Sequence, residues 1–310
     1  MVEQFETYRT HLFSIAYRML GSAMDAEDIV QEAYLHAQST PTESIKSYKA
    51  FLTTIVIRLC LNQLNSAHHQ RETYLGPWLP EPLLTADHPD LVNPENHAIE
   101  YESISMAFLV LLESLKPAER AVFLLREVFD YDYPEIADII SKNEPACRQL
   151  FSRAKKHITT KQPRFKSTPE KHRQMLESFL RAAEEGSLTG LMSVLAEDVV
   201  LWADSGGKVK GAATRPVSGR DAVARFSLGT RRFLPGDYRI EIAEVNGQPA
   251  LIYRVEDRAF LVLTIDLVPV GNALRAKDAP SSDRDGSIEV EAQHICAIRI
   301  VANPEKLARV

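Results

Sequence analysis

YPEIADIISKNEPACRQLFSR, at residues 133–153, has the pattern of two short helices that cross at a tight turn. Such a helix-turn-helix needs a small residue where its helices cross, and Ala137 provides one. Asn143 suits the N-cap of the second helix, because its side chain can accept a hydrogen bond from the first helical turn. The positions expected to face inward are apolar, at Ile136, Ile140, Cys147 and Leu150. The pattern therefore predicts a helix-turn-helix.

The outer face of the predicted second helix is polar and basic. The residues expected to point outward are Glu144, Pro145, Arg148, Gln149 and Ser152. Arginine and glutamine can form paired hydrogen bonds to guanine and adenine edges. Residues 145–166 hold seven basic residues and no acidic one, namely Arg148, Arg153, Lys155, Lys156, Lys161, Arg164 and Lys166. On this motif alone, DNA recognition and a plain helical hairpin with a solvated basic face explain the pattern equally well.

The composition narrows the choice of function. The 310 residues carry a formal net charge of −6, so a nucleic-acid site must be a local basic patch. The three cysteines form no CxxC pair, so neither a disulfide framework nor a cysteine zinc site is expected, and we expect no cofactor or other metal. No apolar run is as long as the roughly 18 residues needed to span a bilayer. The first residues include Glu3 and Glu6, where a signal peptide would be basic and then apolar. The sequence predicts a cytoplasmic protein with no membrane partner.

The chain divides into five blocks by pattern. Apolar residues recur at helical spacing in residues 1–67 and again in 98–162, which predicts two all-α domains. Prolines interrupt residues 68–97 and, more briefly, 163–170, which reads as two linkers. Residues 171–310 begin with one amphipathic helix and continue as strand-like segments, which predicts an α+β domain.

Finer boundaries follow from local signals. Gly21 is expected to end the first helix, Asp25 to cap the second, and the third to run from about residue 48 to 64. A flexible insertion is expected at residues 271–286, which are rich in Asp, Ser and Ala. The expected strands of the last block lie at residues 199–202, 238–245, 250–255, 259–268 and 294–300.

Six motifs together resemble one family. They are DAEDIVQEAYLHA (25–37), SYKAFLTTIVIRLCLNQL (47–64), WLPEP (78–82), LKPAERAVFLLREVFDYDYPEIADIISKNEPACRQLFSRAKKHI (115–158), DSGGKV (204–209) and NPEKL (303–307). Their order and spacing resemble extracytoplasmic-function (ECF) RNA polymerase sigma factors with a fused C-terminal SnoaL-like domain, the SigJ type. The resemblance covers essentially the whole chain. It implies a sigma region 2 bundle, a region 4 helix-turn-helix and a SnoaL-like α+β cone with a curved mixed sheet.

The resemblance also implies partners and a role for each motif. The partners are the clamp and flap regions of core RNA polymerase and promoter DNA, and the protein is expected to be a monomer when free. The residues implied to dock on polymerase are Asp25, Asp28, Gln31 and Glu32. Those implied to contact the −10 promoter element are Ser44, Lys46, Tyr48, Lys49 and Arg58. Those implied to read the −35 element are Glu144, Pro145, Arg148, Gln149, Ser152, Arg153, Lys155 and Lys156.

A third set is implied to join the domains and regulate them. It comprises Trp78, Leu79, Pro80, Glu81, Pro82, Asp204, Gly206, Gly207, Lys208, Asn303, Pro304, Lys306 and Leu307. We expect Trp78 to anchor on the C-terminal domain, and Lys208 to be solvated or paired with Asp204. The corresponding hypothesis is a closed form in which WLPEP and the C-terminal domain pack against the helical domains.

Other functions stay open from the sequence alone. Asp204 could act as an acid or base if buried, but no histidine lies near it in the sequence, so we favour a turn and interface role and expect no catalytic residue and no enzyme. The C-terminal domain could instead hold a small-molecule ligand, as a sensor or as a cyclase- or isomerase-like enzyme. A conventional DNA-binding regulator is the remaining alternative; it would bind operator DNA unaided, usually as a dimer.

Overall fold

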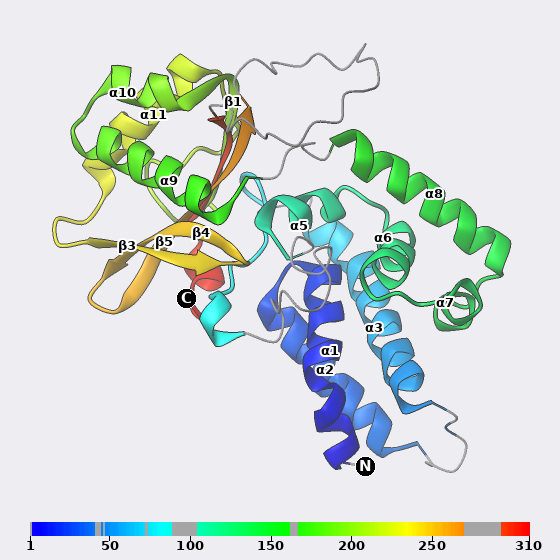
Figure 1. Ribbon diagram of the computed structural model, residues 1–310. Coiled ribbons are helices and arrows are strands. Elements are labelled where there is room, and N and C mark those ends of the chain that lie inside the picture. The colour runs from blue at the N-terminus through cyan, green and yellow to red at the C-terminus, as the bar shows by residue number, and fades with distance from the viewer. Residues whose placement is uncertain are drawn as a thin grey trace, which may run out of the picture.

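The computed structural model describes residues 2–40, 45, 47–71, 74–88, 104–161, 167–269 and 293–310. The insertion predicted at residues 271–286 lies outside them. Within the described part, two groups of helices and one α+β domain pack around the segment at residues 74–88, drawn in cyan in Figure 1.

The first three helices form a bundle: α1 (Val2–Leu20), α2 (Ala23–Gln38) and α3 (Tyr48–Arg71). The chain turns after α1 at Gly21, which has a positive φ of 70°, as the sequence predicts. The expected cap of α2 was wrong. Its N-cap is Ser22, whose hydroxyl accepts a hydrogen bond from the Asp25 N–H, so Asp25 lies inside the first turn. Helix α3 also runs past its predicted end.

The next helices belong to the same hydrophobic core as the bundle. They are α5 (Met106–Glu113), α6 (Pro117–Phe123), η4 (Leu124–Val128), α7 (Tyr133–Ile140) and α8 (Glu144–Lys161). The turn between α7 and α8 passes through Ser141, in the left-handed region with φ 55°. The Asn143 carboxamide oxygen accepts from the Ala146 N–H at 2.9 Å, so the predicted cap of α8 is present. Cys147 is buried and Leu150 is half-buried against the core.

The C-terminal domain begins with α9 (Pro169–Glu184) and α10 (Leu188–Val194). Its remaining elements are β1 (Leu195–Asp204), β2 (Val217–Ser218), α11 (Arg220–Thr230), η5 (Arg231–Phe233), β3 (Arg239–Val245), β4 (Gln248–Val255), β5 (Arg258–Pro269), β6 (Gln293–Val301) and η6 (Pro304–Lys306). The open sheet has the order β2-β1-β6-β5-β4-β3, with β1 and β6 parallel and the other pairs antiparallel. The predicted α+β class with a mixed sheet is confirmed.

The two faces of this sheet have different neighbours. Along β4, the side chains of Leu251 and Tyr253 belong to the core that lies under α9, α10 and α11. The alternate residues Ala250 and Ile252 point to the other face, because successive strand residues project to opposite sides. There they share a smaller core with Leu79. The linker is therefore part of the hydrophobic packing on this face.

The segment at residues 74–88 is extended, except for the single turn η2 (Thr85–Asp87). Its centre, residues 79–83, is buried. At its far end Leu84 forms an antiparallel bridge with Val245 at the end of β3. The prolines thus exclude a helix, as predicted, and the segment is fixed between the helices and the sheet. We call residues 74–88 the hinge segment.

Candidate functional site

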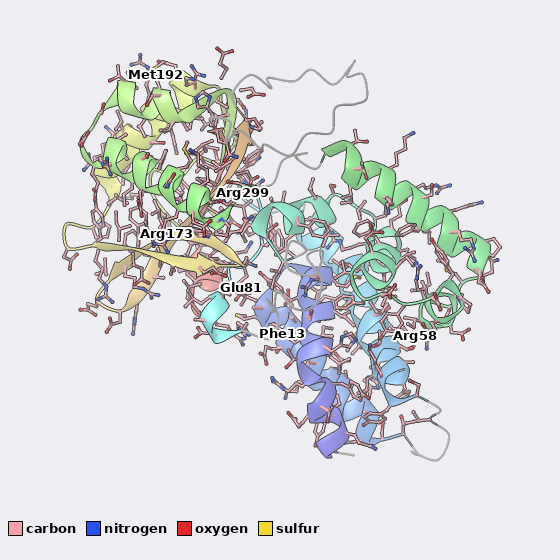
Figure 2. The ribbon with its side chains drawn as sticks, in the orientation of Figure 1. Phe13, Arg58, Glu81, Arg173, Met192 and Arg299 are labelled. Atoms are coloured by element: carbon pink, nitrogen blue, oxygen red, sulfur yellow. The ribbon has the colours of Figure 1, made fainter. Side chains whose placement is uncertain are left out.

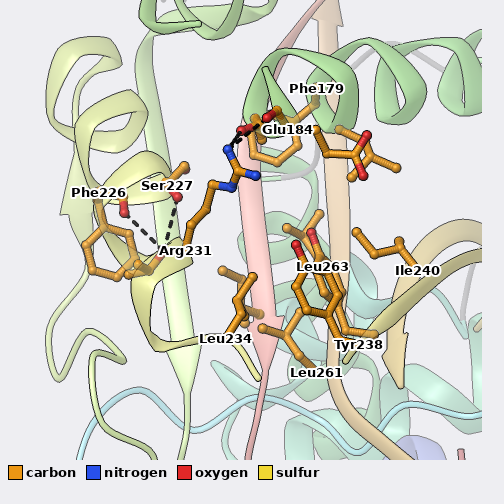
Figure 3. Close-up of a pocket in the computed structure, with 15 residues that line it drawn as sticks. Phe179, Glu184, Phe226, Ser227, Arg231, Leu234, Tyr238, Ile240, Leu261 and Leu263 are labelled. Atoms are coloured by element: carbon orange, nitrogen blue, oxygen red, sulfur yellow. Dashed lines mark hydrogen bonds between the residues drawn. The ribbon is translucent and has the colours of Figure 1, made fainter. Parts of the chain in front are cut away.

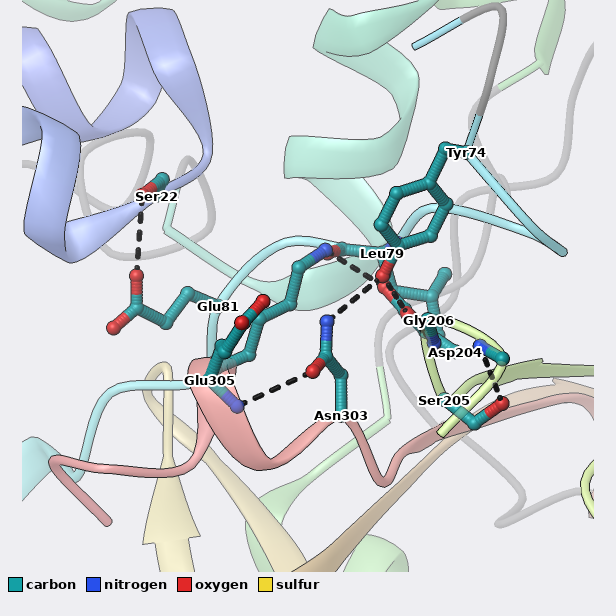
Figure 4. Close-up of polar contacts among 11 residues, drawn as sticks. Ser22, Tyr74, Leu79, Glu81, Asp204, Ser205, Gly206, Asn303 and Glu305 are labelled. Carbon is teal, nitrogen blue, oxygen red and sulfur yellow. Dashed lines mark hydrogen bonds and ion pairs between the residues drawn. The ribbon is translucent and has the colours of Figure 1, made fainter. Parts of the chain in front are cut away.

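The carboxylate of Glu81 lies at the start of helix α2. Its Oε2 accepts from the backbone N–H groups of Ala23 at 2.7 Å and Met24 at 3.2 Å, and from the Ser22 hydroxyl at 3.2 Å. The first N–H groups of a helix have no partner within the helix, and the helix dipole favours an anion there. A residue of the hinge segment therefore completes the N-terminus of a helix in the bundle (Figures 2 and 4).

Trp78 lies between the helical bundle and the C-terminal domain. A Cβ atom on Gly21 would lie 2.9 Å from Cη2 of the indole, so only glycine allows the ring so close to this turn. On the other side, Lys306 Nζ lies 3.8 Å from the centre of the ring, a cation–π contact. Trp78 anchors on the C-terminal domain, as expected, and also on the end of α1.

The side chain of Asp204, at the end of β1, is fully buried and holds the hinge segment from the C-terminal side. Its Oδ2 accepts from the Leu79 N–H at 2.8 Å and pairs with Lys306 Nζ at 2.7 Å. Its Oδ1 accepts a hydrogen bond from the Tyr74 hydroxyl and one at 3.3 Å from the Gly206 N–H (Figure 4). Burial, followed by this bond to Asp204, raises the pKa of Tyr74. The carboxylate has no solvent access and several donors.

Residues 303–306, near the end of the chain, also contact the hinge segment and Asp204. Lys306 also donates to the carbonyl of Leu79, and the Asn303 side chain donates to the Tyr74 hydroxyl at 3.0 Å. The backbone N–H of Asn303 donates to the carbonyl of Asp204 at 3.0 Å. The hydrogen bonds that Lys306 donates are charge-assisted, and such bonds are roughly twice as strong as neutral ones. The hinge segment, the end of β1 and residues 303–306 form one network.

Of the two expectations for Lys208, solvation or a pair with Asp204, the pair was wrong, and the side chain is exposed. Lys208 pairs with Glu305 at 2.5 Å, and Lys306 is the cation that meets Asp204. The reason is the turn after β1: Gly207 has a positive φ of 74°, and a Cβ there would lie 2.5 Å from Leu75. This turn carries Lys208 to the exposed rim and leaves Asp204 inside.

A second polar cluster ties the other end of the hinge segment to both domains. The fully buried Tyr17 in α1 donates its hydroxyl to the Glu81 carbonyl at 2.6 Å and accepts from Asn246 Nδ2 at 2.7 Å. Asn246 Oδ1 accepts from the Leu83 N–H at 3.0 Å. The sequence reasoning missed Tyr17, Tyr74 and Asn246. For Asn246 a signal existed, since Asn-Gly after a strand favours a turn with positive φ.

Helix α3 packs directly against the helix-turn-helix. Arg58 in α3 donates to the Ser141 hydroxyl at 3.0 Å and to the Ile139 carbonyl at 3.4 Å, both at the turn after α7 (Figure 2). The Thr53 and Tyr131 hydroxyls lie 2.9 Å apart, and Lys49 lies over the Tyr131 ring at 5.3 Å. Two of the residues expected to contact the −10 element therefore touch the helix-turn-helix or the loop before it.

The other residues expected to bind nucleic acid or polymerase lie mostly at the surface. Tyr48 is half-buried, and Ser44 and Lys46 lie outside the described residues. Arg148 stacks on the Tyr133 ring at 4.2 Å and Lys155 pairs with Glu127 at 3.0 Å. Of the residues expected to dock on polymerase, Asp25 is half-buried and the exposed ones are Asp28, Gln31 and Glu32. Of those expected to read the −35 element, Glu144 is half-buried and the exposed ones are Pro145, Arg148, Gln149, Ser152, Arg153, Lys155 and Lys156.

The C-terminal domain also contains a cavity of about 910 Å³ at the end of the sheet where β1 and β6 finish. A smaller hollow of about 70 Å³ lies beside it under α9 and α11, and is drawn in Figure 3. There the Arg231 guanidinium donates to the carbonyls of Ala183 and Glu184, at the end of α9. The lining of both spaces is mainly apolar.

Comparisons with known proteins give a consistent result. The model of Sigma-70 region 2 matches residues 4–70, and that of Sigma-70, region 4 matches residues 105–158. The ECF RNA polymerase sigma factor SigJ of Mycobacterium tuberculosis (strain ATCC 25618 / H37Rv) is 38% identical over 308 residues, covering 98% of this chain and 92% of that protein. SigG of the same organism (strain CDC 1551 / Oshkosh) is 30% identical over 275 residues, covering 79% and 70%.

Solved structures agree with the sequence relatives. The crystal structure of the Mycobacterium tuberculosis extracytoplasmic function sigma factor SigJ is similar to this chain, with a TM-score of 0.69 at 35% identity. The match covers 99% of this chain and 98% of that one, so it includes the C-terminal domain. Among the described residues, no helix has the length and apolar character needed to cross a membrane.

Proposed function

The chain belongs to the ECF RNA polymerase sigma factors, and we propose that its C-terminal domain regulates it by holding the hinge segment in a closed form. As a member of this family it binds core RNA polymerase and promoter DNA and directs transcription initiation. The observation that carries the proposal is the ion pair between Lys306 and the buried Asp204. Both partners also bond to the backbone of Leu79, Asp204 to its N–H and Lys306 to its carbonyl.

The packing of α3 on the helix-turn-helix supports a closed form. Elements centred near positions −35 and −10 lie about 25 base pairs apart, roughly 85 Å at 3.4 Å per base pair. Here Arg58 and Lys49, proposed to contact the −10 element, touch the turn after α7 and Tyr131 instead. Two modules in direct contact cannot occupy both elements, so promoter binding requires their separation.

The hinge segment supports a role for the C-terminal domain in that separation. The segment connects the two helical modules, and its backbone bonds to Asp204 and Asn246 of the C-terminal domain and to Gly21 of the bundle. Moving the modules apart requires a change in this segment. Contacts that bind the closed form alone shift the equilibrium away from the extended form by their full free energy.

We assign the sites by the same reasoning. The exposed face of α8 reads the −35 element, where Arg148 and Gln149 are able to form bidentate hydrogen bonds with bases. The exposed residues Asp28, Gln31 and Glu32 of α2 dock on polymerase. Both faces stay open in the closed form. Of the residues proposed for the −10 element, Arg58 and Lys49 contact Ser141 and Tyr131 but are themselves still exposed.

A sigma factor acts by binding, and we propose that the C-terminal domain has no catalytic role. Every oxygen of the Asp204 side chain is engaged with the hinge segment, Lys306 or its own loop, which supports an interface role. We place the protein in the cytoplasm, where RNA polymerase works.

The experiment compares Lys306→Met with Lys208→Met in the full chain. Both remove a lysine charge of the same C-terminal network, but only the first breaks the pair with Asp204. We expect Lys306→Met to bind core polymerase at least tenfold more tightly and to give more run-off transcript at limiting sigma factor, because it loses closed-form contacts. Lys208→Met should match the wild type. Equal affinities for the two variants, with cooperative unfolding retained, would contradict the closed-form proposal.

A further inference from the structure

The C-terminal segment at residues 302–310 contacts the hinge segment and also lines the cavity of the C-terminal domain. Asn303 and Lys306 contact the hinge segment. Pro304 and Leu307 line the cavity of about 910 Å³, as do residues at both ends of the segment. Arg309 pairs with Glu27 of helix α2 at 3.4 Å. One short segment therefore separates a cavity from the contacts that hold the domains together.

The cavity has the size and lining of a small-molecule site. Ligand pockets are typically about 300–1,000 Å³ and mainly apolar, with a few charged groups. This cavity shares Phe226, Leu234 and Leu261 with the smaller hollow of Figure 3, so the two spaces adjoin. Phe233 and Val209 line it and are 47% and 39% exposed. Large apolar side chains left open around a concave surface mark a binding site.

Two basic residues in the lining of the cavity indicate the charge of the ligand. Lys210 and Arg258 are exposed residues that line the cavity. The acidic residue beside them, Asp257, is already paired with Arg239 at 2.7 Å. In the part of the chain that the structure describes, neither Lys210 nor Arg258 has a carboxylate partner. An apolar interior with cations at its edge favours a ligand with an apolar body and one anionic end.

We propose that this cavity binds an amphipathic carboxylate and that the bound ligand strengthens the hold of residues 303–306 on the hinge segment. The cavity is already open, so a ligand adds contacts to Pro304 and Leu307 without displacing them. The second half of the proposal rests on the closed form described above. Coupling between two sites is reciprocal, so loosening the hinge contact must weaken ligand binding by the same factor.

Dodecanoate is the probe, added below its micellar concentration to the full chain without polymerase or DNA. Its binding is followed by displacement of the fluorescent apolar anion anilinonaphthalene sulfonate, and dodecan-1-ol is the uncharged comparison. We expect saturable displacement by dodecanoate. Arg258→Gln should weaken dodecanoate at least fivefold and leave dodecan-1-ol unchanged. Arg173→Gln, an exposed arginine in α9 outside the cavity lining, is the matched control and should have no effect.

Filling the cavity tests the location. Thr230→Trp places a large side chain at a residue that lines both spaces, and Ala212→Trp places one in the larger cavity from the loop after β1. Either variant should abolish displacement while the circular dichroism spectrum is retained. Binding that survives both substitutions, or no saturable binding to the wild type, would overturn the proposal. That result would leave the polymerase experiment untouched.

The coupling is tested with Lys306→Met, which we expect to weaken dodecanoate at least fivefold. Unchanged affinity in this variant would overturn the coupling to the hinge segment even if the cavity binds the probe. The two proposals can also fail separately in the other direction. If Lys306→Met leaves polymerase binding unchanged, the closed-form proposal fails. If Arg258→Gln still weakens dodecanoate binding, the binding site stands.

Discussion

The Tyr131 hydroxyl lies 2.9 Å from the Thr53 hydroxyl, across the contact between the loop before α7 and the second turn of α3. Thr53 is fully buried and Tyr131 nearly so. This pair joins the two modules that we propose must separate for promoter binding, and neither residue is assigned to DNA or polymerase. It offers a way to weaken the closed form without touching a proposed binding residue.

We therefore expect Tyr131→Phe to raise the extended population. The substitution keeps the ring and its contact with Lys49 but leaves the Thr53 hydroxyl without this partner, a loss of about 1 kcal/mol or more. Small-angle X-ray scattering should show a larger radius of gyration than for the wild type. Tyr34→Phe serves as the control, because the Tyr34 hydroxyl has no hydrogen bond to any residue that the structure describes. Identical scattering for both variants would contradict this prediction.

The buried His11 predicts a loss of stability in mild acid. Burial, and then the charges of Lys49 and Arg18, lower the pKa of His11 from 6.5 to about 4. Above pH 6.5 the folded and unfolded states are both neutral at this residue. As the pH falls from 6.5 towards 4, the unfolded chain binds a proton that the folded chain does not, so folding weakens by up to about 3 kcal/mol.

The measurement is urea unfolding at pH 7 and pH 4.5 for the wild type and His11→Gln. Burial also lowers the pKa of His88, His172 and His294, so both proteins should lose stability in acid. The variant should lose about 2–3 kcal/mol less between these two pH values, because it has no proton to bind at this position. Equal losses in the two proteins would show that His11 titrates normally.

Tyr17→Phe should destabilise the whole chain. The hydroxyl is fully buried and bridges the Glu81 carbonyl and the Asn246 amide, so its removal leaves two buried polar groups short of a partner. We expect a decrease of about 1–3 kcal/mol in the free energy of unfolding, measured by urea denaturation. A change below about 0.5 kcal/mol would mean that water or another group replaces the hydroxyl.

Asp204→Asn should lower the free energy of unfolding by more than Tyr17→Phe does. The substitution keeps the shape of the side chain but removes the charge that meets Lys306 in a buried site. Breaking one partner of a buried ion pair costs about 3–5 kcal/mol. Glu305→Gln, which breaks the exposed pair with Lys208, should cost less than about 1 kcal/mol. Thermal unfolding of both variants checks the order of the two effects.

Arg148→Ala tests the proposed reading of the −35 element. We expect run-off transcription with core polymerase to fall and discrimination at one −35 base pair to weaken by about 1–3 kcal/mol. Lys155→Ala removes a charge from the same helix that is already paired with Glu127, and should lower transcription without altering base preference. A neutral result for Arg148→Ala would contradict the orientation assigned to α8.

Local patterns predicted most elements of this fold, but the sequence reasoning expected a single helix in the C-terminal domain and missed α10, α11 and the short strand β2. The helix-turn-helix and the main strands follow from periodicity, turn residues and caps, which depend on neighbours in the sequence. The cap of α2 shows the limit, because Ser22 and Asp25 are both good N-cap residues and the sequence reasoning chose the wrong one. The Ser-x-x-Asp spacing was the available signal, since it resembles a capping box.

Contacts between distant segments could not be predicted in the same way. The sequence reasoning expected Lys208 to be solvated or paired with Asp204, its neighbour in the sequence, whereas the lysine that meets Asp204 is Lys306, 102 residues away. Tyr17 and Asn246 are 229 residues apart and carry no motif that relates them. Such pairs are set by how the finished domains pack. The motifs indicated which segments meet, but not which atoms.

The separation between the hinge segment and its lysine partner has a consequence for synthesis. Leu79 and Lys306 are 227 residues apart, so the ribosome completes both promoter-recognition modules well before it makes the residues that restrain them. At about 5–20 residues per second, the roughly 145 residues from the end of α8 at Lys161 to Lys306 take about 7–29 s. Under the proposed closed form, a newly synthesised chain lacks the contacts of Lys306 during this period, and polymerase that binds it then binds a factor whose hinge segment is not yet held.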